Sequence, residues 1–186
     1  DTVLKKKIPV LLRISYGIAM TMLFSCSNIE LHPYQVFDDE SPRNLNIQQY
    51  QRLSRTIGDD TVTIAFAGDT QRFYDELNLF VKKVNQLPDV DFVMLAGDIS
   101  DFGLLQELEW INRELNDLRA PYFAVVGNHD VLGNGEKVFK RYFGSLDYSF
   151  NYKDYKFILH NTNSREYASA NVPDIDWLTK ELNDQS

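Results

Sequence analysis

Three short polar motifs in this sequence combine residue types that could carry out chemistry. They read Gly68-Asp69-Thr70-Gln71, Gly97-Asp98-Ile99-Ser100-Asp101 and Gly127-Asn128-His129-Asp130. Carboxylates and an amide oxygen are hard ligands that suit Mn²⁺, Mg²⁺, Fe or Zn²⁺, and a carboxylate can bridge two ions. Two ions about 3.5–4 Å apart can clamp a phosphoryl group, and a histidine beside them can protonate the leaving group. If the motifs converge, they could form a two-metal hydrolytic site.

Each motif follows an apolar run that predicts a β-strand, namely 62–67, 92–96 and 122–126. Apolar residues at helical spacing between the runs predict two helices, the first with Phe73, Leu77, Phe80, Val81 and Val84, the second with Leu104, Leu108, Ile111, Leu115 and Leu118. Three strand–loop–helix units in series predict an α/β fold with largely parallel strands. Because such sheets bind ligands beyond the carboxyl ends of their strands, the motifs would meet there. Any one motif alone could equally be a turn or a helix cap.

Three further elements are predicted outside this alternating region. A helix with Asn44 or Asn46 as N-cap would place Ile47, Tyr50, Leu53 and Ile57 on one face. Residues 148–152 and 155–159 predict two strands joined by a tight turn at 153–154. Pro173 would open a short helix, 175–182.

The three motifs resemble the first three motifs of the calcineurin-like metallophosphoesterases. The spacing is similar too, with 29 residues from Asp69 to Asp98 and 30 from Asp98 to Asn128. The resemblance runs from about Val62 to the end of the chain. It implies an α/β fold, an incomplete metallophosphoesterase sandwich with a mixed, largely parallel sheet. It also implies hydrolysis of phosphoester substrates by two divalent metal ions such as Mn, Fe or Zn, with a metal-bound hydroxide as nucleophile.

The resemblance also implies a role for each residue. Asp69 would bind the first metal, Asp98 would bridge both, and Asn128 would bind the second through its side-chain oxygen. His129 would stand beside the scissile phosphate as an acid or charge stabiliser. Two other acids would orient their neighbours rather than bind metal, and these are Asp101 and Asp130.

Two features depart from the family pattern. Gln71 stands where the family usually has a histidine, and its amide oxygen is a weaker metal ligand than imidazole. The family's later ligands are a histidine after a further strand and a Gly-His-x-His motif, whereas this chain has no Gly-His pair. His160 ends a strand and is not expected to bind metal, since a lone histidine there is usually structural. We therefore expect the 186-residue chain alone to be inactive. Either the C-terminal motifs lie beyond it, or the protein is a catalytically degenerate metal-binding or interaction lipoprotein on the same scaffold.

The N-terminal segment has the features of a secretory signal. Lys5, Lys6 and Lys7 precede an 11-residue apolar run, 14–24, that is too short to span a membrane comfortably. Cys26 comes directly after Ser25, and the segment resembles the signal of bacterial lipoproteins, in which this cysteine is lipidated. The interpretation divides the chain into a signal peptide (1–25), a tether with an N-terminal helix (26–60) and the N-terminal part of a metallophosphoesterase domain (61–186). The protein would be extracytoplasmic and lipid-anchored to a bacterial membrane. A buried hydrophobic helix with an incidental free cysteine is the alternative.

Composition and incomplete motifs argue against several other functions. The formal charge of −8 disfavours nucleic-acid binding, and a single cysteine excludes a disulfide framework or a cysteine-rich metal site. A Rossmann-like nucleotide-binding domain is disfavoured, because the chain has no Gly-x-Gly-x-x-Gly motif after the first predicted strand. Asp101-Phe102-Gly103 spells a kinase triplet without the other kinase motifs. Gly133-Asn134-Gly135 lacks the third glycine of a dinucleotide loop and is expected to be a flexible loop at the rim of the site.

Overall fold

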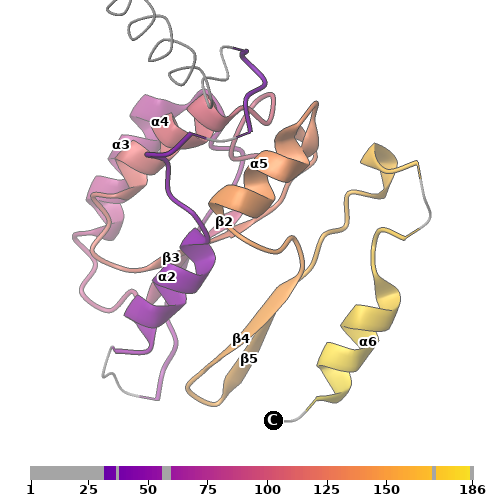
Figure 1. Ribbon diagram of the computed structural model, residues 1–186. Helices are drawn as coiled ribbons and strands as arrows, with labels where there is room; N and C mark the ends of the chain where they lie inside the picture. Colours follow the sequence, from indigo (N-terminus) through magenta and orange to yellow (C-terminus); the bar gives the residue numbers. More distant parts are fainter. Residues whose placement is uncertain (1–31, 37, 56–59, 169–170, 185–186) are drawn as a thin grey trace, which may run out of the picture. The chain divides into compact units, whose positions relative to one another are not determined.

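The computed structural model describes residues 32–36, 38–55, 60–168 and 171–184 (Figure 1). The predicted signal peptide and Cys26 lie outside these residues, and so does Ile57 of the predicted N-terminal helix. Within the described ranges, no helix is both long enough and apolar enough to cross a membrane.

A parallel sheet of three strands carries the predicted α/β region. The strands occur in the order in which they follow one another along the chain: β1 (Ile64–Ala67), β2 (Phe92–Ala96) and β3 (Tyr122–Val125). Two further strands, β4 (Tyr148–Tyr152) and β5 (Tyr155–Leu159), form a separate antiparallel pair joined by a turn at 153–154. The prediction of an α/β fold with largely parallel strands is thereby confirmed.

The two faces of the central strand β2 pack against different layers. Val93 and Leu95 belong to the core with helices α3 (Tyr74–Val84), α4 (Leu105–Leu115) and α5 (Gly135–Tyr142). Phe92 and Met94 face the opposite way, because successive side chains of a strand alternate, and they pack with the β4–β5 pair. All four side chains are at least nine-tenths buried. Burial of its first four residues on both faces explains why the strand is a continuous apolar run.

The helix α2 (Leu45–Leu53) forms where it was predicted but presents a different face to the core. Ile47 is 57% exposed, whereas the polar side chains of Asn46 and Gln49 are buried. Asn46 makes two hydrogen bonds with Ala124 of the edge strand β3: its Nδ2 donates to the carbonyl oxygen at 3.2 Å, and its Oδ1 accepts from the backbone N–H at 2.9 Å. The predicted apolar face is therefore only partly right: Leu53 is buried as expected, but Ile47 and Tyr50 are exposed, because the edge of β3 requires polar partners from this helix.

The helix α5 was not predicted, and its first residue was assigned to a flexible rim loop. Asn134 is instead the N-cap of α5, and Gly135 is buried. A Cβ at Gly135 would lie 2.2 Å from the carbonyl oxygen of Asp130 and 2.9 Å from the Cα of Gly103. The glycine therefore serves a close approach of two backbones.

The C-terminal part of the chain contains the predicted helix after Pro173. This helix, α6 (Ile175–Asn183), has Asp174 as its N-cap, whose side chain accepts a hydrogen bond from the backbone N–H of Trp177 at 3.0 Å. Its Glu181 accepts a hydrogen bond from Ser149 of β4 at 2.6 Å. Two short 3₁₀ turns, η1 (His129–Val131) and η2 (Ser164–Glu166), complete the described elements.

Candidate active site

The loops that follow β1, β2 and β3 are hydrogen-bonded to one another. The backbone N–H of Asp69 donates to the carbonyl oxygen of Gly97, and that of Gln71 donates to the carbonyl oxygen of Asp98, both at 3.2 Å. The backbone N–H of His129 donates to Asp98 Oδ1 at 3.0 Å. The three motifs that the sequence singled out therefore meet at the carboxyl ends of the strands, with the Asp98 loop in the middle.

Two glycines allow the second and third loops to touch. A Cβ at Gly127 would lie 2.1 Å from the backbone nitrogen of Asp98, and one at Gly97 would lie 2.9 Å from the Cα of Gly127. Asp69 and Asp98, which follow Gly68 and Gly97, both have left-handed backbones with φ of 51° and 50°. Aspartate tolerates this conformation better than most residues do. The Gly-Asp pairs thus combine close backbone contact with an outward-facing carboxylate.

Asp130 joins the second and third loops from below the site. Its Oδ1 accepts hydrogen bonds from the backbone N–H and the hydroxyl of Ser100 at 2.7 and 2.8 Å. Its Oδ2 accepts from the backbone N–H groups of Gly127 at 2.8 Å and Ile99 at 3.2 Å. The side chain is buried, and burial raises the pKa of Asp130 while these hydrogen bonds oppose the rise. Asp130 therefore lies beneath the site and binds the two loops together.

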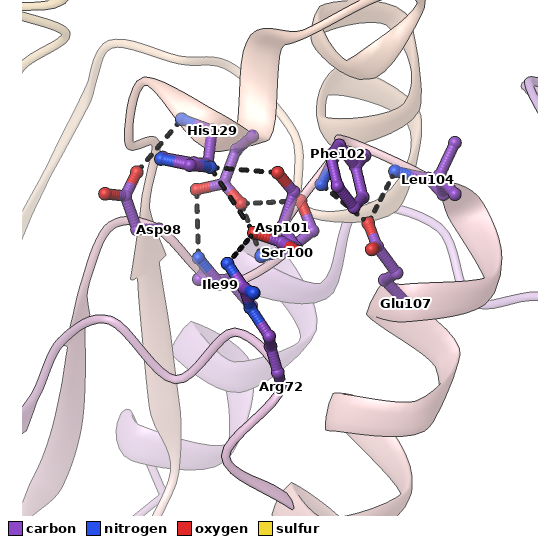
Figure 2. A network of polar contacts seen from close by, with 10 residues as sticks. Arg72, Asp98, Ile99, Ser100, Asp101, Phe102, Leu104, Glu107 and His129 are labelled. Carbon is purple, nitrogen blue, oxygen red and sulfur yellow. Dashed lines mark hydrogen bonds and ion pairs between the residues drawn. The ribbon is translucent and has the colours of Figure 1, made fainter.

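The same loop is held at its far end by Glu107 (Figure 2). This buried carboxylate, in the first turn of α4, accepts hydrogen bonds from the backbone N–H groups of Phe102 at 3.0 Å and Leu104 at 3.1 Å. The sequence analysis did not single out Glu107. A glutamate three residues after a helix start is the signal that could have identified it.

His129 lies between Asp98 and Asp101, and its ring is fixed by one hydrogen bond (Figure 2). Nδ1 is 2.9 Å from the backbone carbonyl oxygen of Asp101. Because a carbonyl oxygen only accepts, Nδ1 carries the proton and Nε2 is the nitrogen left to gain or lose one. The hydrogen bond to Asp101 raises the pKa of His129, and the negative charges of Asp98, Asp101 and Asp130 add to the rise. The half-exposed ring is thus oriented for proton exchange at Nε2.

The predicted metal ligands differ from the supporting acids in their exposure. Asp69 and Asn128 are exposed and Asp98 is half-buried, whereas Asp101 and Asp130 are buried. Oδ1 of Asp98 accepts from His129, which leaves Oδ2 for another partner. Oxygens from three strand ends suit a hard divalent ion. Within the residues that the structure describes, however, no three His, Cys, Asp or Glu side chains are grouped to hold a metal. The donors present therefore fit part of a divalent-metal site.

Gln71 lies beside this network. When its amide is oriented so that Nε2 faces the neighbouring acceptors, it donates to Asp101 Oδ1 at 3.2 Å and to the carbonyl oxygen of Ser100 at 3.3 Å. Its Oε1 is then the atom left for a metal. His160 belongs to a different cluster, since its Nδ1 is 2.8 Å from Asp147 Oδ1 and its ring stacks on Trp177.

Arg72 is a further site residue that the sequence analysis missed. Its Nη2 lies 2.8 Å from Asp101 Oδ1, the carboxylate beside His129. The contact depends on the folding of one loop against another, so no local sequence pattern indicates it.

Comparisons with known proteins agree with this geometry. A sequence model of the family described as calcineurin-like phosphoesterase matches residues 62–182. A 3′,5′-cyclic-nucleotide phosphodiesterase of Nostoc sp. is 30% identical over 105 residues, which are 55% of this chain and 40% of that protein. A Xenorhabdus bovienii protein named "Probable cyclic nucleotide phosphodiesterase" is 25% identical over 56 residues, 30% of this chain and 23% of that protein. This chain thus spans less than half the length of either relative. The family match covers well over half of the chain, so the chain belongs to the calcineurin-like phosphoesterase family.

Proposed function

We propose that the protein hydrolyses phosphodiesters of the cyclic-nucleotide class with two divalent metal ions held at the ends of β1, β2 and β3. The observation that carries the proposal is the convergence of the three loops on Asp98, with His129 fixed beside it. Family membership supports phosphoester hydrolysis, and the names of the two relatives suggest the class of substrate.

The metal ligands in this proposal are oxygen atoms of four side chains: Asp69, Gln71, Asp98 and Asn128. Bound ions would supply positive charge to the phosphoryl oxygens and lower the pKa of a nearby water. The chain offers two carboxylates and two amides for this purpose. We therefore expect the 186-residue chain alone to bind metal weakly and to turn over slowly.

His129 would protonate the leaving oxygen. Its Nδ1 is occupied by the Asp101 carbonyl, so the proton would pass through Nε2. Asp101 holds the ring in this orientation, and Asp130 keeps the His129 loop against the Asp98 loop. The backbone carbonyl of Asp101 and the buried carboxylate of Asp130 would thus position the reacting groups.

The test compares Asp98→Asn with His129→Ala in the complete gene product. Asp98→Asn removes a metal-binding charge, so metal content and activity should fall together. His129→Ala removes no proposed ligand, so metal content should stay while hydrolysis slows by about 10²–10⁴-fold. The loss should be smaller for an aryl phosphodiester, whose leaving group needs little protonation, than for a 3′,5′-cyclic nucleotide. Asp89→Asn, an exposed acid outside the three motif loops, serves as the matched control.

Two outcomes would refute parts of this proposal. If His129→Ala loses metal as Asp98→Asn does, His129 is a ligand. If the wild-type protein binds metal but hydrolyses none of the phosphoesters tested, a binding or interaction protein on the same scaffold replaces the enzyme. The partial set of metal donors in the described residues is the observation that keeps this second function open.

We also propose that the protein is extracytoplasmic and anchored to a bacterial membrane by lipid on Cys26. The basic cluster, the apolar run and the position of the cysteine support this. Expression of the gene in bacteria should place the wild-type protein in the membrane fraction and Cys26→Ala in the soluble fraction. Equal membrane association of the two would refute the anchor.

A further inference from the structure

Arg72 lies in the loop between β1 and α3 and has an uncommon backbone conformation. Its φ is 58°, in the left-handed region that long side chains rarely adopt. The backbone N–H of Gln71 donates to the Asp98 carbonyl, and that of Phe73 donates to the Thr70 carbonyl, both at 3.2 Å. These contacts fix the turn on both sides of Arg72. The side chain consequently reaches the Asp98 loop and contacts Asp101 (Figure 2).

The guanidinium is held at one side and exposed over the rest. Its Nη2 lies 2.8 Å from Asp101 Oδ1, and this is the one hydrogen bond of the group among the described residues. The Arg72 side chain is 65% exposed, whereas that of Asp101 is 10% exposed. A guanidinium has five N–H donors in one plane. The remaining donors therefore face solvent beside the candidate active site.

The carboxylates around the site repel an anionic substrate, and Arg72 would oppose this repulsion together with the proposed metal ions. Asp98 Oδ1 accepts from the backbone N–H of His129 at 3.0 Å and Asp101 Oδ1 lies 3.6 Å from His129 Nδ1, so both carboxylates lie beside His129 and would repel a phosphodiester anion. Arginine matches the geometry of phosphate through paired N–H donors, and it stays charged at any physiological pH. Its contact with Asp101 holds the guanidinium in place before a ligand arrives, which reduces the entropy lost on binding.

We propose that Arg72 is a substrate-binding residue whose guanidinium donates to a non-bridging oxygen of the phosphoryl group while Asp101 holds its other edge. The inference rests on the proposed phosphoester hydrolysis. It assigns to Arg72 the recognition of the anion, separate from the metal ligands and from His129.

The experiment measures phosphate binding and kinetics in the complete protein loaded with Mn²⁺. Arg72→Ala should weaken the binding of inorganic phosphate, measured by titration calorimetry, by about 10- to 100-fold. KM for a phosphodiester should rise by a similar factor, with a smaller change in kcat and unchanged metal content. Arg72→Lys should recover part of the loss, because it restores the charge without the paired donors. Arg72→Gly, which suits the left-handed backbone, should repeat the Arg72→Ala result without strain.

Arg113→Ala, which removes an exposed arginine from the last turn of α4, is the matched control and should leave phosphate binding unchanged. A fall in kcat with a shifted pH profile and unaltered phosphate affinity would overturn the proposal, because Arg72 would then act only by positioning Asp101 and His129. A wild-type protein that binds phosphate through Arg72 but hydrolyses nothing would refute the proposed function and keep this inference. A wild-type protein that does not bind phosphate would overturn the inference itself.

Discussion

Replacing Gly127 by alanine should damage the site through one steric contact. The new Cβ would lie 2.1 Å from the backbone nitrogen of Asp98 and 2.2 Å from its Oδ1. Neither backbone can yield easily, so the Asp98 loop must move by about 1 Å to restore an ordinary contact. Overpacking of this kind costs about 1–3 kcal/mol, and in a chain of this size each kcal/mol lowers the melting temperature by about 2–4 °C.

Gly68→Ala provides the matched control. A Cβ there would lie 3.7 Å from the Cβ of Ala96, an ordinary van der Waals contact. Both substitutions reduce the entropy of the unfolded chain equally, so the difference between them isolates the clash. Thermal unfolding followed by circular dichroism should place Gly127→Ala about 2–12 °C below Gly68→Ala.

Metal titration adds a second readout for the same pair of variants. Because Asp98 is a proposed ligand, its displacement should weaken Mn²⁺ binding by about 10- to 100-fold in Gly127→Ala alone. Equal melting temperatures and equal metal affinities in the two variants would refute the reasoning that the two loops are in tight contact.

Three further predictions concern stability. Asp130→Asn should lower the free energy of unfolding by about 1–3 kcal/mol, because one amide oxygen cannot accept all four hydrogen bonds; an unchanged melting temperature would contradict this. Asp91 accepts hydrogen bonds at the base of the sheet, with Lys153 among the donors, and its pKa is lowered despite opposing burial. The ionised Asp91 carboxylate therefore stabilises the folded protein above its unfolded pKa of about 3.9, and this stabilisation is lost as the pH falls through the lower folded pKa. In urea unfolding, the free energy of unfolding of Asp91→Ala should be about 2 kcal/mol below that of the wild type at pH 7. The two values should converge in strong acid. Asn46→Ala should lower the free energy of unfolding by about 1–3 kcal/mol, whereas Ile47→Ala should leave it nearly unchanged. A larger loss for Ile47→Ala than for Asn46→Ala would instead support the apolar face predicted from sequence.

The sequence predicted those elements whose periodicity reflects burial. The bounds of β2 and β5 agree with the predicted strands, because a short apolar run between two turns most often forms a buried strand. The face of α2 was predicted only in part, with Leu53 buried but Ile47 exposed, because hydrophobic spacing cannot show that a strand edge needs an amide partner. Gly135 was assigned to a flexible loop because its tight contact with Gly103 arises only in the folded chain.

The candidate site also has a part that the sequence could predict and a part that it could not. Its three motifs could be predicted because each follows a strand, and parallel strands bring their ends together. The partners that hold the loops could not, since Arg72 and Ser100 act across about 30 residues of sequence. Asp130 was expected to orient its neighbours, and the structure shows which groups it contacts. The roles of the metal ligands stay predictions.

The pairing of Asn46 with Ala124 bears on how this protein can be divided. The family match begins at residue 62, so a shortened protein would naturally start there and lack α2. Such a protein would leave the backbone N–H of Ala124, on the outer strand β3, without its partner, while the carbonyl would keep its hydrogen bond from the Tyr148 hydroxyl. Exposed strand edges recruit other chains. We therefore expect a protein that starts at residue 62 to self-associate more readily than one that retains α2, and light scattering of the two proteins would test this.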